Sequence, residues 1–331
     1  MVLFTNDHQA SRAFCEAFSF QLVDHHMPNA TCFLIAYSVV FVLELARWRL
    51  PSTGKVGWWT RVVLMGAASV SLFTHTLYLL DRIFLATSGT TSTWAISWHD
   101  WGILSAWTLA LAYVWLLIQR SENWIGIFVL PFVLMLVSVS IILSPKTLES
   151  ANSATGWRLL HGFAMMVGTM LVSLGFAMAA MYFLQAWRLK NKRASQSRFQ
   201  LPSLEYLQLF GRNCLLGSAA SIGFGMVSGV IMNLTRDGRV EWLDRGILFS
   251  AGLFVWLVIA SAIQWQLSRR GSGDATAWMN ILSFLIVAAA VALVLSTPHG
   301  GNQMFAPDEN GQSSVNRDLR VEPSLSEGKV P

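Results

Sequence analysis

Long apolar runs restrict the fold of this sequence more than any other feature. A helix that crosses a bilayer needs about 20 mostly apolar residues, whereas a strand of a membrane barrel needs only about 10 in an alternating pattern. The runs that reach the helical length are residues 28–46, 62–80, 101–118, 124–143, 160–186, 213–234, 246–265 and 277–296. The sequence therefore predicts an all-α polytopic membrane protein with about eight transmembrane helices. The first run is the weakest, because Asn29 and Glu44 lie at its ends.

Composition supports the same fold class. The 331 residues are 54% hydrophobic and 12% charged, with a formal net charge of +5. A soluble domain carries a charged fraction of about 25%. In a membrane protein, basic residues report orientation rather than affinity for nucleic acid. We therefore expect the lipid bilayer as the first partner, and no nucleic acid.

The distribution of Lys and Arg predicts the orientation, because short cytoplasmic loops are enriched in both. The loops after the first and fifth runs are the most basic, with Arg47, Arg49, Lys55, Arg61, Arg188, Lys190, Lys192, Arg193, Arg198 and Arg212. Loops of the opposite parity hold fewer, although the 236–245 loop is an exception. Both termini are thus predicted outside, and the protein is expected in the inner (plasma) membrane as a multi-pass protein.

Three segments follow from this pattern. Residues 1–27 have no clean apolar core of a secretory signal and are expected to form an outer N-terminal segment. Residues 28–300 are expected to form one transmembrane helical domain. Residues 301–331 are polar with few large apolar side chains, which predicts a disordered tail.

Three of the seven histidines lie in or beside the apolar runs. His161 belongs to "WRLLHGFAMM", and His299 follows the last run, so both are predicted at the outer face. His75 lies six residues before Asp81, roughly 9 Å inside the outer boundary. The alternatives are interfacial hydrogen bonds for His161 and His299 and a hydrogen bond to a neighbouring helix for His75. The other histidines are expected to be solvated: His8, His25, His26 and His99.

The residues around the outer histidines favour haem over zinc. A zinc site generally has further protein ligands, and no Cys, Asp or Glu clusters beside His161 or His299. Haem iron needs only one or two axial ligands, with apolar walls. Arg158 stands three residues before His161, on the same helix face, and is our candidate partner for a haem propionate. Arg82 and Arg245 are predicted at the same surface.

Other chemistry has little support in the sequence. Cys15, Cys32 and Cys214 form neither a C-x-x-C pair nor a C-x-x-C-H haem-attachment motif. We identify no catalytic nucleophile, acid–base pair or phosphate-binding loop, so we assign no catalytic residue. Small residues such as Gly168 in the fifth run and Gly225 and Gly229 in the sixth favour close contact of each helix with neighbouring helices.

Five stretches in a fixed order resemble a known family. They are "HTLYL" at 75–79, "SENWIGIFVLPFVLMLVSVSIIL" at 121–143, "LLHGFAMMVGTMLVSLGFAMAAMYFLQAWRLK" at 159–190, "LPSLEYLQLFGRN" at 201–213 and "AWMNILSFLIVAAAVALVLSTPHGG" at 277–301. The sequence resembles the CcsA/ResC-type cytochrome c assembly proteins, nearest the shorter HemX-like or YpjD-like branch. The 201–213 stretch also suits an amphipathic segment at the inner interface.

The resemblance implies a haem-handling function in cytochrome c assembly. The family's two outer histidines, which are axial ligands of haem iron, map to His161 and His299, and its membrane-embedded histidine matches His75. The implied cofactor is non-covalent haem b. The implied partners are a second membrane subunit and apocytochrome c. The chain is then a component of a cytochrome c synthase complex and not an enzyme on its own.

Two departures from the family keep other functions open. The tryptophan-rich loop of the full synthases is replaced by "NLTRDGRVEWLDRGILF", which retains Trp242 and Asp244, and the seventh run has Gln264 as its nearest polar residue where a histidine is expected. A haem-free HemX-like scaffold or regulator of a partner protein is the main alternative. A small-solute transporter is a third, although no two runs share matched Gly/Pro interruptions.

Overall fold

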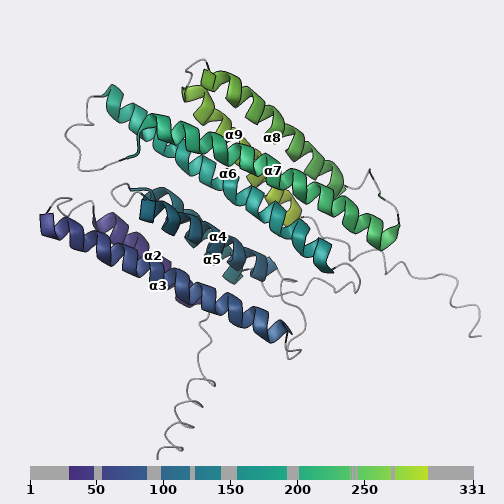
Figure 1. Ribbon diagram of the computed structural model, residues 1–331, viewed down its shortest axis with the longest axis horizontal. Coiled ribbons are helices and arrows are strands. Elements are labelled where there is room, and N and C mark those ends of the chain that lie inside the picture. Colours follow the sequence, from purple (N-terminus) through teal and green to yellow (C-terminus); the bar gives the residue numbers. More distant parts are fainter. Residues whose placement is uncertain are drawn as a thin grey trace, which may run out of the picture. The chain divides into compact units, whose positions relative to one another are not determined.

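The computed structural model shows an all-helical chain in the parts that it describes, which are residues 30–47, 54–87, 98–119, 124–142, 155–191, 201–238, 240, 242, 245–269 and 273–296. Their helices are α2 (Ala30–Ala46), α3 (Gly54–Thr87), α4 (Trp98–Gln119), α5 (Gly126–Ile142), α6 (Thr155–Lys190), α7 (Leu204–Asp237), α8 (Arg245–Arg269) and α9 (Gly273–Ser296) (Figure 1). None of these residues forms a β-strand. The all-α prediction is therefore confirmed for the described residues.

Six of these helices are long and apolar enough to cross a membrane, which indicates a multi-pass membrane protein. They are Lys55–Arg82, His99–Gln119, Gly156–Lys190, Leu204–Thr235, Ile247–Arg269 and Gly273–Leu293. The shorter apolar helices are Thr31–Ala46 and Gly126–Ile142. Each predicted run coincides with one helix, while eight spans and outer termini stay predictions. Residues 1–27 and 301–331 lie outside the described residues.

By their internal contacts, the residues divide into two units, Met1–Ala288 and Ala289–Pro331. The core is in the first unit, and every contact discussed below belongs to it. One buried apolar cluster draws on α2 to α7, including Phe33, Tyr113 and Met178. A second cluster around Ile222 and Leu257 packs α6, α7 and α8 together.

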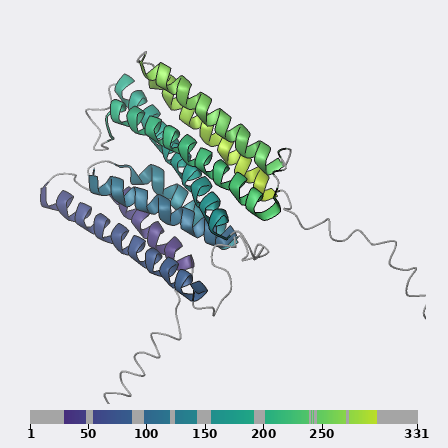
Figure 2. The same ribbon diagram turned by 45° about the vertical axis from the view of Figure 1, so that its right-hand side comes forward.

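Helices α6 and α7 make the most extensive contact of any described pair, and they lie side by side in Figures 1 and 2. The contact is close because glycines remove side chains from it. A β-carbon at Gly168 would lie 2.5 Å from Cγ1 of Ile222, and one at Gly225 would lie 2.9 Å from the sulfur of Met165. The small residues that favour close helix contact thus lie between α6 and α7.

The 201–213 stretch, which suits an amphipathic segment at the inner interface, belongs to the same helix as the run at 213–234. Ser203 caps α7 by accepting a hydrogen bond from the Tyr206 backbone, and the helix then continues to Gly238, whose φ of 66° ends it. Leu207 is buried against the core. The stretch is thus the first part of one long helix, because its apolar face has protein to pack against.

Candidate functional site

His161 lies near the start of α6, half-buried against α7. Its Nδ1 is 2.7 Å from the backbone oxygen of Gly225. A carbonyl oxygen can only accept a hydrogen bond, so Nδ1 must carry the proton and donate it. The lone pair of the neutral ring therefore resides on Nε2, which has no hydrogen bond within the described residues. Metal-binding histidines commonly use this arrangement, with one ring nitrogen donating to a carbonyl and the other facing the metal.

Glycines of α7 create the space for this imidazole. A β-carbon at Gly229 would lie 2.9 Å from Nδ1 of His161, so any larger residue there would displace the ring. The Gly225 oxygen also accepts a hydrogen bond of 2.8 Å from the hydroxyl of Ser228, one turn along the same helix. The sequence of α7 therefore fixes both the position and the tautomer of the ring.

Arg158 and an indole ring lie beside His161. Arg158 stands three residues earlier on α6 and is half-buried, and among the described residues it makes no ion pair or hydrogen bond. Trp101 of α4 reaches the next position of α6, since a β-carbon at Gly162 would lie 2.6 Å from the indole ring. A cation without a counter-ion, an imidazole with an available nitrogen and an aromatic wall thus gather near the start of α6.

His75 occupies a different environment, fully buried on α3. Its Nδ1 is 3.1 Å from the hydroxyl of Tyr37, and its ring stacks on Phe33 with centroids 4.5 Å apart. Nε2 has no hydrogen bond of good geometry among the described residues, and its polar neighbour is the backbone of Ile103 on α4. The predicted alternative, a hydrogen bond to a neighbouring helix, is confirmed. A part for His75 in haem binding stays a prediction.

His99 was expected to be solvated, and this expectation is wrong. It is half-buried at the start of α4, with Nδ1 2.7 Å from the backbone oxygen of Ser140 at the end of α5. The next residue, Asp100, is buried and forms an ion pair of 2.8 Å with Arg82. Arg82, which the sequence placed at the surface of the outer histidines, therefore already has a carboxylate partner.

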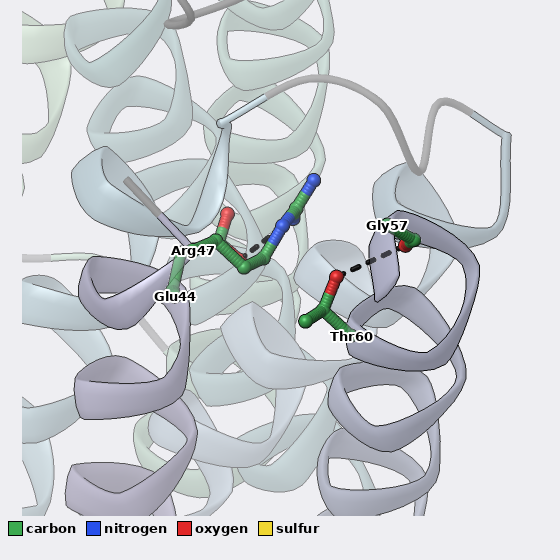
Figure 3. A network of polar contacts seen from close by, with 4 residues as sticks. All are labelled: Glu44, Arg47, Gly57 and Thr60. Atoms are coloured by element: carbon green, nitrogen blue, oxygen red, sulfur yellow. Dashed lines mark hydrogen bonds and ion pairs between the residues drawn. The ribbon is translucent and has the colours of Figure 1, made fainter. Parts of the chain in front are cut away.

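A second buried ion pair lies at the end of α2 and was not identified from the sequence. Glu44 has no exposed surface, and its Oε2 is 2.9 Å from the guanidinium of Arg47. That guanidinium also lies 5.2 Å from the ring centroid of Trp124. Figure 3 shows the pair beside the first turns of α3, where Thr60 donates to the Gly57 carbonyl. The i, i+3 spacing of Glu44 and Arg47 was the available signal.

Tyr113 of α4 completes this cluster. A β-carbon at Gly126 would meet its ring at 2.9 Å and the Glu44 carboxyl carbon at 3.1 Å, so both side chains pack on one glycine of α5. The Tyr113 hydroxyl and Oε1 of Glu44 are buried without hydrogen bonds among the described residues. The cluster joins three helices, α2, α4 and α5, through charge and ring packing.

The described residues contain no group of three or more His, Cys, Asp or Glu side chains that could hold a bare metal ion. His299 lies outside these residues. Among the described histidines, His161 and His99 each place Nδ1 on a backbone carbonyl oxygen, at 2.7 Å. Comparisons with models of known families, with curated proteins and with solved structures find no match to this chain.

Proposed function

We propose that this protein binds haem b without a covalent bond at the outer end of α6 and handles it during cytochrome c assembly. The observation that carries the proposal is the imidazole of His161. Its Nδ1 donates to the Gly225 carbonyl at 2.7 Å, and its Nε2 is left to coordinate iron. The family resemblance of the sequence supplies the biological setting of the proposal.

The residues around His161 fit haem b. His161 would hold the haem iron, and His299 is the second ligand that the family resemblance implies. Arg158, three residues from His161 and without an ion pair among the described residues, would hold a propionate by a charge-assisted hydrogen bond. When bound, this group would be a haem that an apocytochrome can take up.

The proposal includes a topology. Eight spans would place both termini and His161 at the outer face of the inner membrane, with the basic loops in the cytoplasm. The second membrane subunit and apocytochrome c would then reach the haem from outside. In this arrangement His75, stacked on Phe33 with its ring enclosed, would act from the interior as a deeper ligand or relay.

The rival function is a haem-free scaffold for a partner protein. The enclosed His75 and the buried ion pair of Glu44 favour it, because they show polar groups committed to packing. The two functions differ in one observable, since a scaffold has no Soret absorption band.

The test is the absorption spectrum of detergent-purified protein after addition of hemin. We expect a Soret band in the wild type and its loss in the His161→Ala, His299→Ala double variant, while both proteins insert in the membrane equally. His99→Ala is the matched control, because His99 also has its Nδ1 on a backbone carbonyl, at 2.7 Å. This control should keep the band. A wild type without a Soret band, or a band equally strong in the double variant, would overturn the proposal in favour of the scaffold.

A further inference from the structure

Two arginines from different helices converge on one tryptophan. The guanidinium carbons of Arg212 on α7 and Arg269 on α8 lie 5.4 Å and 5.5 Å from the ring centroid of Trp265. Because both lie within 5.5 Å of one point, the two guanidinium carbons are at most about 11 Å apart. An anion bound between them would be attracted by both positive charges.

The described residues provide no such anion. Arg47 and Arg82 each have a carboxylate at 2.9 Å or 2.8 Å, whereas neither Arg212 nor Arg269 forms an ion pair within the described chain. Asp274, at the start of α9, accepts a hydrogen bond from the Tyr182 hydroxyl instead. The pair of guanidinium groups is therefore open to a ligand from outside.

The two arginines lie at the edge of the apolar layer, a level that suits a ligand at the membrane interface. Arg269 is the last residue of the apolar span Ile247–Arg269, so it marks the end of the apolar layer. Arg212 lies two turns into α7 and shares the same indole, which places it at the same level. Trp265 is half-exposed, and tryptophans are enriched at this level of a membrane protein.

Apolar side chains continue from this point toward the middle of the layer. Leu216, one turn beyond Arg212, and Val258, two turns from Trp265, are exposed. A free phosphate would make no favourable contact with these apolar side chains, whereas the acyl chains of a lipid would pack on them. Guanidinium groups bind phosphate oxygens in pairs of hydrogen bonds, and basic sites between transmembrane helices bind anionic headgroups.

We propose that Arg212, Trp265 and Arg269 form a binding site for the phosphate group of an anionic phospholipid. The two guanidinium groups bind the headgroup, the indole orients both of them, and the exposed apolar residues of α7 and α8 contact the acyl chains. The site is independent of haem, because it shares no residue with the region around His161.

The experiment is native mass spectrometry of the full-length protein in neutral detergent with added phosphatidylglycerol. Loss of a guanidinium that bonds a phosphate directly weakens binding by about tenfold. We therefore expect Arg269→Gln to weaken binding of this lipid by about tenfold, and the Arg212→Gln, Arg269→Gln double variant to weaken it further. Binding of phosphatidylcholine should be the same in all variants.

The matched control is Lys55→Gln, Lys190→Gln, which removes the same charge from exposed positions at the helix ends on the same predicted side of the membrane. It should bind phosphatidylglycerol like the wild type.

Unchanged lipid binding in the arginine double variant, or an equal loss in the lysine control, would overturn the proposal. Displacement of the lipid by inorganic phosphate alone would also overturn it, since the site would then recognise a free anion. Arg269 lies at a helix end, so the single variant tests the site even if the double variant fails to fold.

Discussion

Helices α2 to α5 and helices α6 to α9 illustrate two kinds of helix contact. In the first group, enclosed polar pairs join neighbouring helices: Glu44 packs on Gly126 of α5, and His75 bonds to Tyr37 of α2. In the second group, the helices approach through glycines, as at Gly168 of α6. A histidine can therefore have a different role in each group.

The two histidines illustrate the difference. His75 is enclosed by an aromatic ring and a hydroxyl group, so its imidazole fills space and satisfies a neighbour. His161 sits on a glycine surface with one nitrogen bonded and the other available. Neither Nε2 has a hydrogen bond among the described residues, so the two rings differ in burial: that of His75 is enclosed, whereas that of His161 is partly exposed.

The largest expected effect concerns the buried ion pair of the first group. Glu44→Ala leaves the guanidinium of Arg47, whose side chain is only 9% exposed, without its carboxylate. Removing one partner of a buried pair costs about 3–5 kcal/mol, so we expect a loss of about 3 kcal/mol in the free energy of unfolding in mixed micelles. Glu205→Ala, at an exposed position in the first turn of α7, is the control and should change little. A loss below 1 kcal/mol for Glu44→Ala would mean that the first group does not depend on its polar pairs.

The next effect concerns the glycine contact of the second group. Gly168→Leu forces a side chain into Ile222, which a β-carbon would already approach to 2.5 Å. Overpacking of this kind costs about 1–3 kcal/mol. Gly156→Leu on the same helix is the control, since a β-carbon there has no neighbour within 4 Å. The same unfolding measurement checks both variants, and equal stabilities would show that α6 and α7 can separate without cost.

The helices were predictable because each is encoded by its own run of residues. Apolar length located every described helix, and small residues indicated close helix contact without identifying the partner helix. Burial of Glu44 was not predictable in the same way: as a charge at the end of an apolar run, it suggested only a weak span. Its environment depends on Gly126 and Tyr113, which lie on other helices.

The same limit applies to the candidate sites. The sequence identified His161 and Arg158 but could not show that a carbonyl 64 residues away fixes the tautomer of the ring. His99 was expected in water because its flanking sequence is polar, yet the end of α5 covers it. The Arg212, Trp265 and Arg269 site likewise depends on the packing of α7 against α8. No local pattern carries such information.

A smaller effect is expected at the glycine under His161. Gly229→Ala places a methyl group 2.9 Å from Nδ1 and moves the ring away from the Gly225 carbonyl. Loss of such an orienting hydrogen bond typically lowers metal affinity 10–100-fold, and we expect about tenfold weaker hemin binding in a titration of the Soret band. Gly66→Ala, where a β-carbon has no neighbour within 4 Å, should bind hemin like the wild type. Unchanged affinity in Gly229→Ala would show that the carbonyl does not position the ring for iron.

The smallest effect separates hydrogen bonding from packing at His75. Tyr37→Phe removes the hydroxyl that lies 3.1 Å from Nδ1 and keeps the ring that packs in the core. Hydrogen bonds between transmembrane helices contribute about 0.6 kcal/mol on average and up to about 1.7 kcal/mol. We expect a coupling energy near 0.6 kcal/mol in a double-mutant cycle of Tyr37→Phe with His75→Leu, measured by unfolding in mixed micelles. A coupling of zero would reduce His75 to a packing residue and weaken the contrast between the two helix groups. A coupling well above 1.7 kcal/mol would instead make this bond a principal tie between α2 and α3, because interhelical bonds are usually weaker: the unfolded chain in the membrane also finds polar partners.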